Sequence, residues 1–219
     1  MKKKIIVTAI FFALSAAFTV LIMTVDVGTV AETGTKIGLY SINTAVHEFF
    51  GVHMLWYDVT NYLGIFSIAI GLCFAVAGLV QWIRRKKLYY VDREFFVLAG
   101  LYVLLGVIYF VFEKVSVNYR PVIMPGAEGP EASFPSSHTL LTCTILGTAM
   151  GMWFRYVKNP GPLWTLVAAS ALIISVAIVG RLVSGVHWAT DIFASLLYTA
   201  TLISAFFTVC SLLYRRKRR

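Results

Sequence analysis

The chain has 219 residues, of which 59% are hydrophobic and only 13% charged, and its mean hydropathy is +0.80. A soluble domain is usually about one-quarter charged, so this composition excludes an ordinary soluble protein and indicates a lipid environment. The net charge is +9, but no nucleic-acid recognition module accompanies it, which argues against nucleic-acid binding.

Six charge-free apolar runs follow one another along the chain, each close to the roughly 20 residues that a membrane-spanning helix needs. The first follows Met1–Lys4 and is predicted to be a retained span, because it is longer than the core of a secretory signal, about 7–15 residues. Backbone in hydrocarbon must satisfy its own hydrogen bonds, so we expect all-α structure: a polytopic bundle of six transmembrane helices, forming a single domain over residues 1–219. The runs are Ile5–Val25, Val59–Ile83, Phe95–Phe112, His138–Phe154, Asn159–Gly180 and Ile192–Tyr214.

Between the first two spans, Ile37–Val52 is predicted to be an amphipathic helix at the membrane interface. It holds His47, with His53 just beyond, and both histidines are weaker catalytic candidates. The three cysteines fall in three different spans and have no metal-ligand spacing, so we expect small apolar core residues rather than disulfides or metal ligands. They are Cys73, Cys143 and Cys210.

The basic residues predict the orientation. If the N-terminus is cytoplasmic and six spans follow, 15 of the 19 Lys and Arg residues lie on the cytoplasmic side, including five over 215–219. Cytoplasmic loops carry the Lys/Arg excess in membrane proteins, so we expect both termini in the cytoplasm and a plasma-membrane location. The outer side holds Lys36, Lys114, Arg120 and Arg181. The last three border two outer loops, against the topogenic trend, and a bound anion is the simplest reason for them.

The second of these loops contains Arg181, His187 and Asp191. Residues four apart share a face of a helix, so Asp191 is expected to hold one ring nitrogen of His187 and leave the other free as nucleophile or base. Arg181 can offer a planar fork of donors to phosphate oxygens. The alternative is that His187 and Asp191 only cap the start of a helix.

The first loop ends in Ser136, Ser137 and His138, directly before an apolar run. This pattern is typical of a helix start with a serine N-cap, and a helix N-terminus is also a ready anion site. Two histidines, three cations and this helix end on one side of the membrane predict a phosphoryl-transfer site, in which one histidine attacks and the other protonates the leaving oxygen.

These segments resemble the three motifs of the type 2 phosphatidic acid phosphatase family, which is related to the vanadium haloperoxidases: Lys-x6-Arg-Pro, Pro-Ser-Gly-His and Ser-Arg-x5-His-x3-Asp. The resemblance covers residues 114–191 by motif and implies six spans, a phosphohistidine intermediate and no metal or other cofactor. It implies that His187 is the nucleophile, that Asp191 orients it and that His138 is the general acid. The phosphate-binding residues that it implies are Lys114, Arg120, Ser136, Ser137 and Arg181.

This chain departs from the family pattern at three places. Lys114 and Arg120 are separated by five residues instead of six, Ser137 replaces the motif glycine, and Gly180 replaces the serine before Arg181. We expect a lipid phosphate phosphatase with its site at the outer face. Candidate substrates are undecaprenyl diphosphate, phosphatidylglycerophosphate and phosphatidic acid, and the oligomeric state is left open. A lipid phosphotransferase and a non-catalytic lipid-phosphate transporter are the alternatives.

Overall fold

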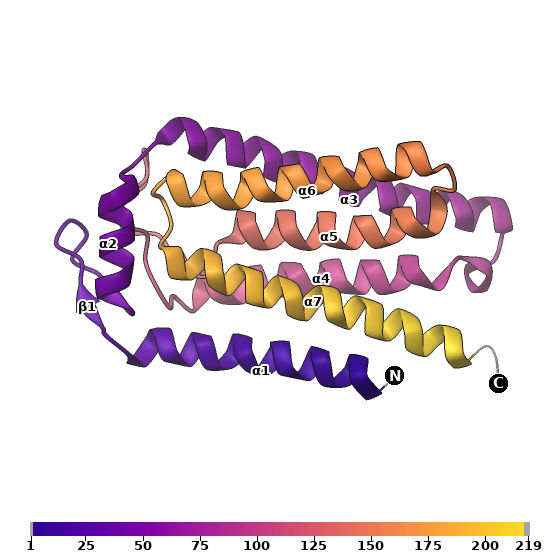
Figure 1. Cartoon of the computed structure of the whole chain (residues 1–219), viewed down its shortest axis with the longest axis horizontal. Helices are drawn as coiled ribbons and strands as arrows, with labels where there is room; N and C mark the ends of the chain where they lie inside the picture. Colours follow the sequence, from indigo (N-terminus) through magenta and orange to yellow (C-terminus); the bar gives the residue numbers. More distant parts are fainter. Residues whose placement is uncertain (1, 217–219) are drawn as a thin grey trace.

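The computed structural model describes residues 2–216. Six long helices lie side by side along its longest dimension, and a short helix and a two-stranded hairpin cover one end (Figure 1). The six-helix bundle that the apolar runs predict is therefore confirmed. The long helices are α1 (Lys2–Thr24), α3 (Met54–Arg85), α4 (Arg93–Lys114), α5 (Ser137–Tyr156), α6 (Pro160–Val183) and α7 (Ala189–Arg216).

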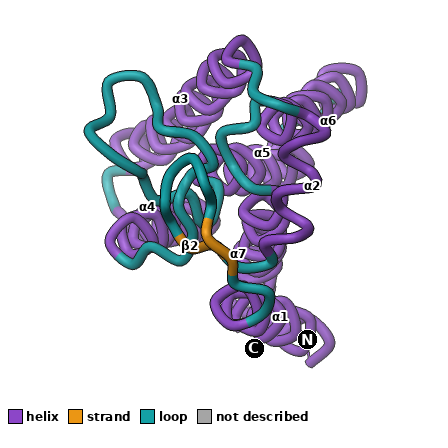
Figure 2. The backbone as a smooth tube through the Cα atoms, turned by 90° about the vertical axis from the view of Figure 1, so that its left-hand side faces the viewer, coloured by secondary structure: helices purple, strands orange, loops and turns teal. Residues whose placement is uncertain are grey.

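Five of these helices are long and apolar enough to cross a membrane by length and composition, and the exception is α5. It lies in the middle of the bundle and packs against α3, α6 and α7, as the end view in Figure 2 shows. A helix shielded from lipid by its neighbours does not need an apolar surface on all sides. This position explains why α5 carries four buried threonines, Thr139, Thr142, Thr144 and Thr148.

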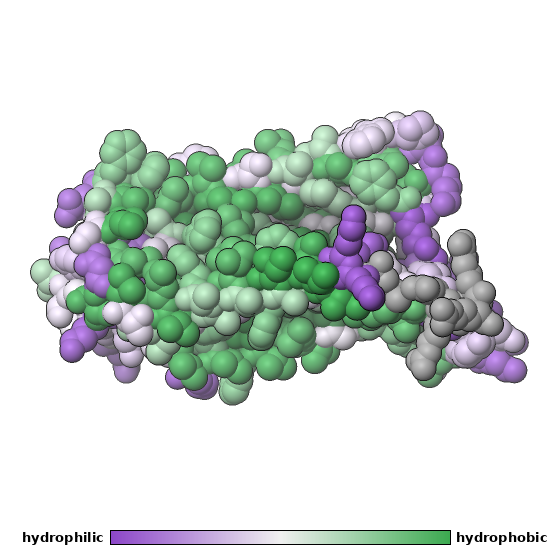
Figure 3. Space-filling view, turned by 60° about the horizontal axis from the view of Figure 1, so that its bottom comes forward, coloured by the Kyte–Doolittle hydropathy of each residue, from purple (hydrophilic) through white to green (hydrophobic). Residues whose placement is uncertain are grey.

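In contrast, α1 packs almost entirely on α7 and leaves most of its surface outside the bundle. Hydroxyl pairs join the two helices: Ser15 Oγ lies 3.1 Å from Thr201 Oγ1, and Thr19 Oγ1 lies 2.9 Å from the Tyr198 hydroxyl. A broad apolar band covers the length of the helices, and hydrophilic residues gather at the two ends (Figure 3). This is the surface of a multi-pass membrane protein.

The two ends of the bundle differ. Lys2 and Arg216 both lie at what we call the terminal end, together with the short helix η1 (Leu88–Tyr90) (Figure 1). Residues 217–219 of the basic tail are outside the described chain. The opposite, loop end carries β1 (Gly28–Thr29), β2 (Lys36–Ile37) and α2 (Tyr40–Phe50), and the loops 115–136 and 184–188. The helix expected over 37–52 is thus the shorter α2.

The cysteines are all free. Cys143 is buried in the bundle and Cys210 is half-buried, as expected for apolar core residues. Cys73 is exposed on α3 and faces the outside of the bundle, so the core expectation is wrong for this residue. Hydrocarbon accepts a small thiol as readily as a protein core does, which is why the sequence does not distinguish the two positions.

Candidate active site at the loop end

The loop 115–136 folds back on itself and carries two site residues. The Arg120 amide donates to the Glu131 carbonyl at 2.9 Å, and the Ser133 amide donates to the Asn118 carbonyl at 2.9 Å. These bonds flank a bridge between Tyr119 and Ala132. The fold-back brings Arg120 and Ser133 to the loop that joins α6 and α7, where His187 lies.

His187 is buried, and its Nδ1 lies 3.0 Å from the Ser133 carbonyl oxygen. A carbonyl can only accept, so Nδ1 carries the proton and Nε2 carries the lone pair. Nε2 has no hydrogen-bond partner among residues 2–216. Burial and the charges of Arg120 and Arg181 hold the pKa of His187 well below its usual range. The ring is therefore neutral, with a basic nitrogen left for chemistry.

Asp191 does not make the hydrogen bond to His187 that the four-residue spacing suggests. Its Oδ2 lies 3.8 Å from His187 Nδ1, and it accepts instead from the Trp188 amide at 3.1 Å. The reason is local: α7 begins at Ala189, so His187 stands before the helix and not one turn below Asp191. Asp191 is the third helical residue, and its carboxylate caps the amide before the helix as in a capping box.

Asn118 completes this arrangement. Its Nδ2 donates to Asp191 Oδ1 at 3.1 Å, and its Oδ1 accepts from the Gly38 amide at 3.2 Å. Its backbone carbonyl holds Ser133, whose own carbonyl holds His187. Asn118 is fully buried. One residue thus connects Asp191, the Ser133 segment that bonds to His187, and the chain that follows β2.

Two guanidinium groups lie near His187, close enough for their charges to lower its pKa. Arg181, in the last turn of α6, is fully buried and donates from Nη2 to Asn61 Oδ1 at 2.9 Å, with its Cζ 5.1 Å from the centre of the Tyr57 ring. Its Nε and Nη1 have no partner in the described chain. Arg120 Nε lies 3.1 Å from Glu131 Oε2, an ion pair without hydrogen-bond geometry, and its buried Nε and Nη1 have no hydrogen-bond partner within residues 2–216. Buried donors with nothing to bind are costly, and an anion would satisfy them.

Two cavities meet at this site. A polar cavity of about 320 Å³ is lined by Arg120, Ser133 and His187, among others. An apolar cavity of about 440 Å³ runs between α3, α4 and α5 and reaches Asn61 and His138. Both are lined by Tyr109, Ser137 and Leu140, so the polar cavity opens towards the apolar one. The combined shape suits a molecule with an anionic head and a hydrocarbon tail.

The family model of the PAP2 superfamily matches residues 96–216, more than half of the chain. This chain belongs to the PAP2 superfamily. A solved structure described as the crystal structure of the first transmembrane PAP2 type phosphatidylglycerolphosphate phosphatase from Bacillus subtilis has the same fold. It is 15% identical, and the match covers 98% of each chain with a TM-score of 0.63. Comparison with curated proteins finds no match.

The first PAP2 motif is altered at the site itself. Lys114 is exposed at the end of α4, with its ammonium 5.8 Å from the centre of the Phe110 ring, and it is not among the described residues that line either cavity. A lysine with the family spacing to Arg120 would stand at position 113. This chain has Glu113 there, and Glu113 does line the polar cavity. The structure therefore brings Arg120 to the site but not Lys114.

The second motif begins α5. Ser136 is the N-cap residue, but its hydroxyl lies 3.0 Å from Thr139 Oγ1, is fully buried and makes no capping bond to the helix amides. Ser137 lines both cavities. His138 lines the apolar one and lies within electrostatic reach of Arg181, His187 and Arg120. Of the two serines, Ser137 therefore lies at the cavities, whereas Ser136 is buried and lines neither of them in the described chain.

His47, in α2, and His53, just after it, do not line either cavity in the described chain. The His47 ring lies 5.4 Å from that of Trp188, and burial lowers the pKa of His47. His53 Nε2 lies 2.9 Å from the Phe50 carbonyl, and the His53 amide donates to the Ser184 carbonyl at 3.1 Å. Both histidines contact the loop 184–188, through Trp188 and Ser184, and neither lines a cavity in the described chain. These positions agree with their lower rank as catalytic candidates.

Sequence reasoning misses Asn61, Glu113, Asn118 and Ser133. None of them follows a periodic pattern. Asn61, Asn118 and Ser133 each bond to a residue distant in sequence, and Glu113 is brought to the polar cavity by the end of α4. Among the described residues, no group of three His, Cys, Asp or Glu side chains gathers closely enough to hold a metal ion.

Proposed function

We propose that this PAP2 protein is a lipid phosphate phosphatase that forms a phosphohistidine on Nε2 of His187. The observation that carries the proposal is the polar cavity itself. It is lined by Arg120 and by a neutral, buried histidine that donates through Nδ1 to the Ser133 carbonyl and keeps Nε2 without a partner in the described chain. Arg181 lies close enough for its charge to lower the pKa of that histidine, and both arginines have buried donors without partners among the described residues. A phosphate there would supply the acceptors that the guanidinium groups lack.

In the first step, Nε2 attacks phosphorus and the bond from phosphorus to the leaving oxygen breaks. We assign the proton for that oxygen to His138, because the negative charge of a bound phosphate would favour the protonated ring against the opposing charges of the two arginines. Water then attacks phosphorus, His138 takes its proton, and the P–N bond electrons return to Nε2. Arg120, Arg181 and the Ser137 end of α5 stabilise the charge on the phosphoryl oxygens. Asp191 acts through the backbone at Trp188.

The apolar cavity beside His138 supports a lipid as the substrate, because a hydrocarbon tail would fill it. The 15-to-4 distribution of basic residues supports a plasma-membrane orientation with the loop end outside and both termini in the cytoplasm. We propose that residues 1–219 act as one integral-membrane domain. Undecaprenyl diphosphate, phosphatidylglycerophosphate and phosphatidic acid are the substrates to compare.

The test is release of inorganic phosphate by purified protein from these three lipids, in the presence of a chelator. We expect release that vanadate inhibits, since vanadate adopts the trigonal-bipyramidal shape of the transition state. Labelled substrate should leave acid-labile phosphate on the protein, and His187→Ala should abolish both signals. Phosphate appearing on an acceptor lipid would identify a phosphotransferase, and binding without turnover would identify a transporter. Loss of activity to chelator alone would contradict the site.

The two histidines should fail differently. Loss of a general acid typically costs 10²–10⁴-fold, and a phenolate leaving group needs little of that help. His138→Ala should therefore keep more of its rate on an aryl phosphate than on a lipid phosphate, whereas His187→Ala should be inactive on both. If His187→Ala kept activity on the aryl phosphate and His138→Ala had none, His138 would be the nucleophile and His187 the general acid.

A further inference from the structure

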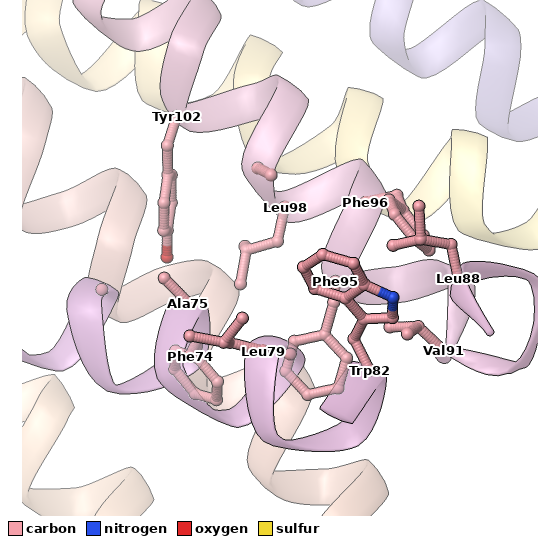
Figure 4. A pocket seen from close by; sticks show the side chains of 13 residues that line it. Phe74, Ala75, Leu79, Trp82, Leu88, Val91, Phe95, Phe96, Leu98 and Tyr102 are labelled. Carbon is pink, nitrogen blue, oxygen red and sulfur yellow. The ribbon is translucent and has the colours of Figure 1, made fainter. Parts of the chain in front are cut away.

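A second apolar cavity lies between α3 and α4, nearer the terminal end. It measures about 290 Å³, and Figure 4 shows its walls: Phe74, Leu79 and Trp82 from α3 face Phe95, Phe96 and Leu98 from α4. Nothing in the proposed chemistry uses this space, and His187 is not among its lining residues.

This inner cavity continues the outer one. Both are lined by Gly71, Ala75 and Tyr102, so together they form one groove along α3 and α4, which we call the long groove. It runs from Asn61, beside Arg181, to Trp82. These two residues are 21 positions apart on one helix, a rise of about 32 Å. That length equals the hydrocarbon thickness of a bilayer, about 30 Å.

Small residues keep the long groove open. Gly71, Ala75 and Gly78 recur on one face of α3, with Ala99 on the facing side of α4. A Cβ at Gly71 would lie 3.4 Å from Tyr102, and one at Gly78 would lie 3.4 Å from Phe95. Larger side chains at these positions would close the groove.

We propose that the long groove binds the tail of the substrate, and that this tail is a single long chain of the polyisoprenoid class. The inference rests on the proposed function and selects among its lipids. The acyl chains of a diacyl lipid in one leaflet reach the bilayer midplane, about 15 Å from the headgroup. They would leave the inner cavity empty, whereas one chain leaving the polar cavity beside Ser137 can follow the groove to Trp82.

The experiment measures kcat/KM for phosphate release from C15 and C55 polyprenyl diphosphates and from dioleoyl phosphatidic acid. Wild type should favour the C55 lipid over the C15 lipid by at least about tenfold. Gly78→Leu should remove that preference by lowering the C55 value and leaving the C15 value within about twofold. Gly78 is 14 residues from Gly64, which lies beside His138, a distance of about 21 Å along α3.

The matched control is Gly100→Leu on α4, where a side chain would meet nothing within 4 Å in the described structure. It should leave both rates unchanged. If Gly78→Leu does not fold, Ala99→Leu blocks the same groove from the other wall. Three results would overturn the proposal and assign the groove to bulk lipid. They are equal turnover of the C15 and C55 lipids by wild type, turnover of the diacyl lipid equal to that of the C55 lipid, and an equal loss on the C15 and C55 lipids in Gly78→Leu. Failure of the proposed function is separate, since no lipid would then release phosphate.

Discussion

The site depends on a chain of polar contacts in which Asn118, a residue outside the family motifs, joins three segments of the loop end. It donates to Asp191 through Nδ2 and accepts from the Gly38 amide through Oδ1. Its backbone carbonyl accepts from the Ser133 amide, and the Ser133 carbonyl in turn accepts from His187. Its role is positioning, because it lines neither of the two cavities at the site. Its loss should therefore change how the chemistry depends on pH as well as how fast it runs.

Asn118→Asp is the sharpest change here, because it places a second carboxyl about 3 Å from Asp191. One of two such carboxyls must stay protonated to donate to the other. The variant should be most active at low pH and lose activity as the shared proton leaves. Wild type lacks this shared proton, so its profile should show only the limbs of the two histidines. Activity should fall on acidification, as His187 becomes protonated well below its usual pKa, and at higher pH, as His138 loses the proton that it gives to the leaving oxygen. A pH profile of kcat/KM for both proteins, with Asn118→Ala as the control that is slow at every pH, makes the comparison. Parallel profiles would contradict the positioning role.

A second prediction at this scale concerns the altered first motif. Glu113 faces the polar cavity and Lys114 does not. Glu113→Lys removes a negative charge and adds a positive one near the phosphate, and exposed charge pairs contribute up to about 1 kcal/mol each. KM for a lipid phosphate should fall roughly fivefold, while Lys114→Ala should leave it unchanged. The opposite pattern, with only Lys114→Ala raising KM, would show that Lys114 reaches the phosphate.

Among the elements, the loop between α6 and α7 relies on close packing against the connection between α2 and α3. Gly185 has φ +68°, and a Cβ there would lie 2.1 Å from the Gly51 carbonyl oxygen. No side chain fits, and only glycine adopts this backbone readily. The contact seats the loop that carries His187 against the rest of the loop end.

Gly185→Ala should therefore cost most of the activity and lower the Tm by several degrees. Gly34→Ala is the matched control: Gly34 has φ +67°, but a Cβ there meets nothing within 4 Å in the described chain. It carries the same backbone strain, about 1–2 kcal/mol, without the clash, and should keep its activity. Phosphate release and thermal unfolding of both variants measure the difference. Equal losses in the two would mean that backbone strain alone, and not the contact with Gly51, matters.

At the scale of the whole molecule, the apolar band fixes how the bundle sits in the bilayer, and the basic residues choose which end is inside. Two exposed positions at opposite ends test this choice. In a background without the three native cysteines, Glu128→Cys at the loop end should react with a membrane-impermeant thiol reagent on intact cells. Lys158→Cys, in the α5–α6 connection, should react only after the cells are opened. The reverse pattern would invert the orientation.

The sequence by itself determined the bundle and most of the site's members. Each span is a local property, because hydrocarbon forces an apolar run of about 20 residues into a helix whatever surrounds it. The motifs named His138, Arg181, His187 and Asp191 without any structure. Among the long helices, only α5 is not apolar enough to span a membrane by composition. Its threonines are tolerated because neighbouring helices shield it from lipid.

Only the tertiary structure decided how those residues are placed and which groups they contact. The start of α7 after His187 replaces the expected carboxylate contact by the Ser133 carbonyl, and helix phase turns Glu113 to the cavity in place of Lys114. The partnership of Asn118 with Asp191, 73 residues away, leaves no local pattern. Contacts of this kind form only when segments distant in sequence pack together. A single sequence shows the residues of each segment but does not show which segments pack against one another.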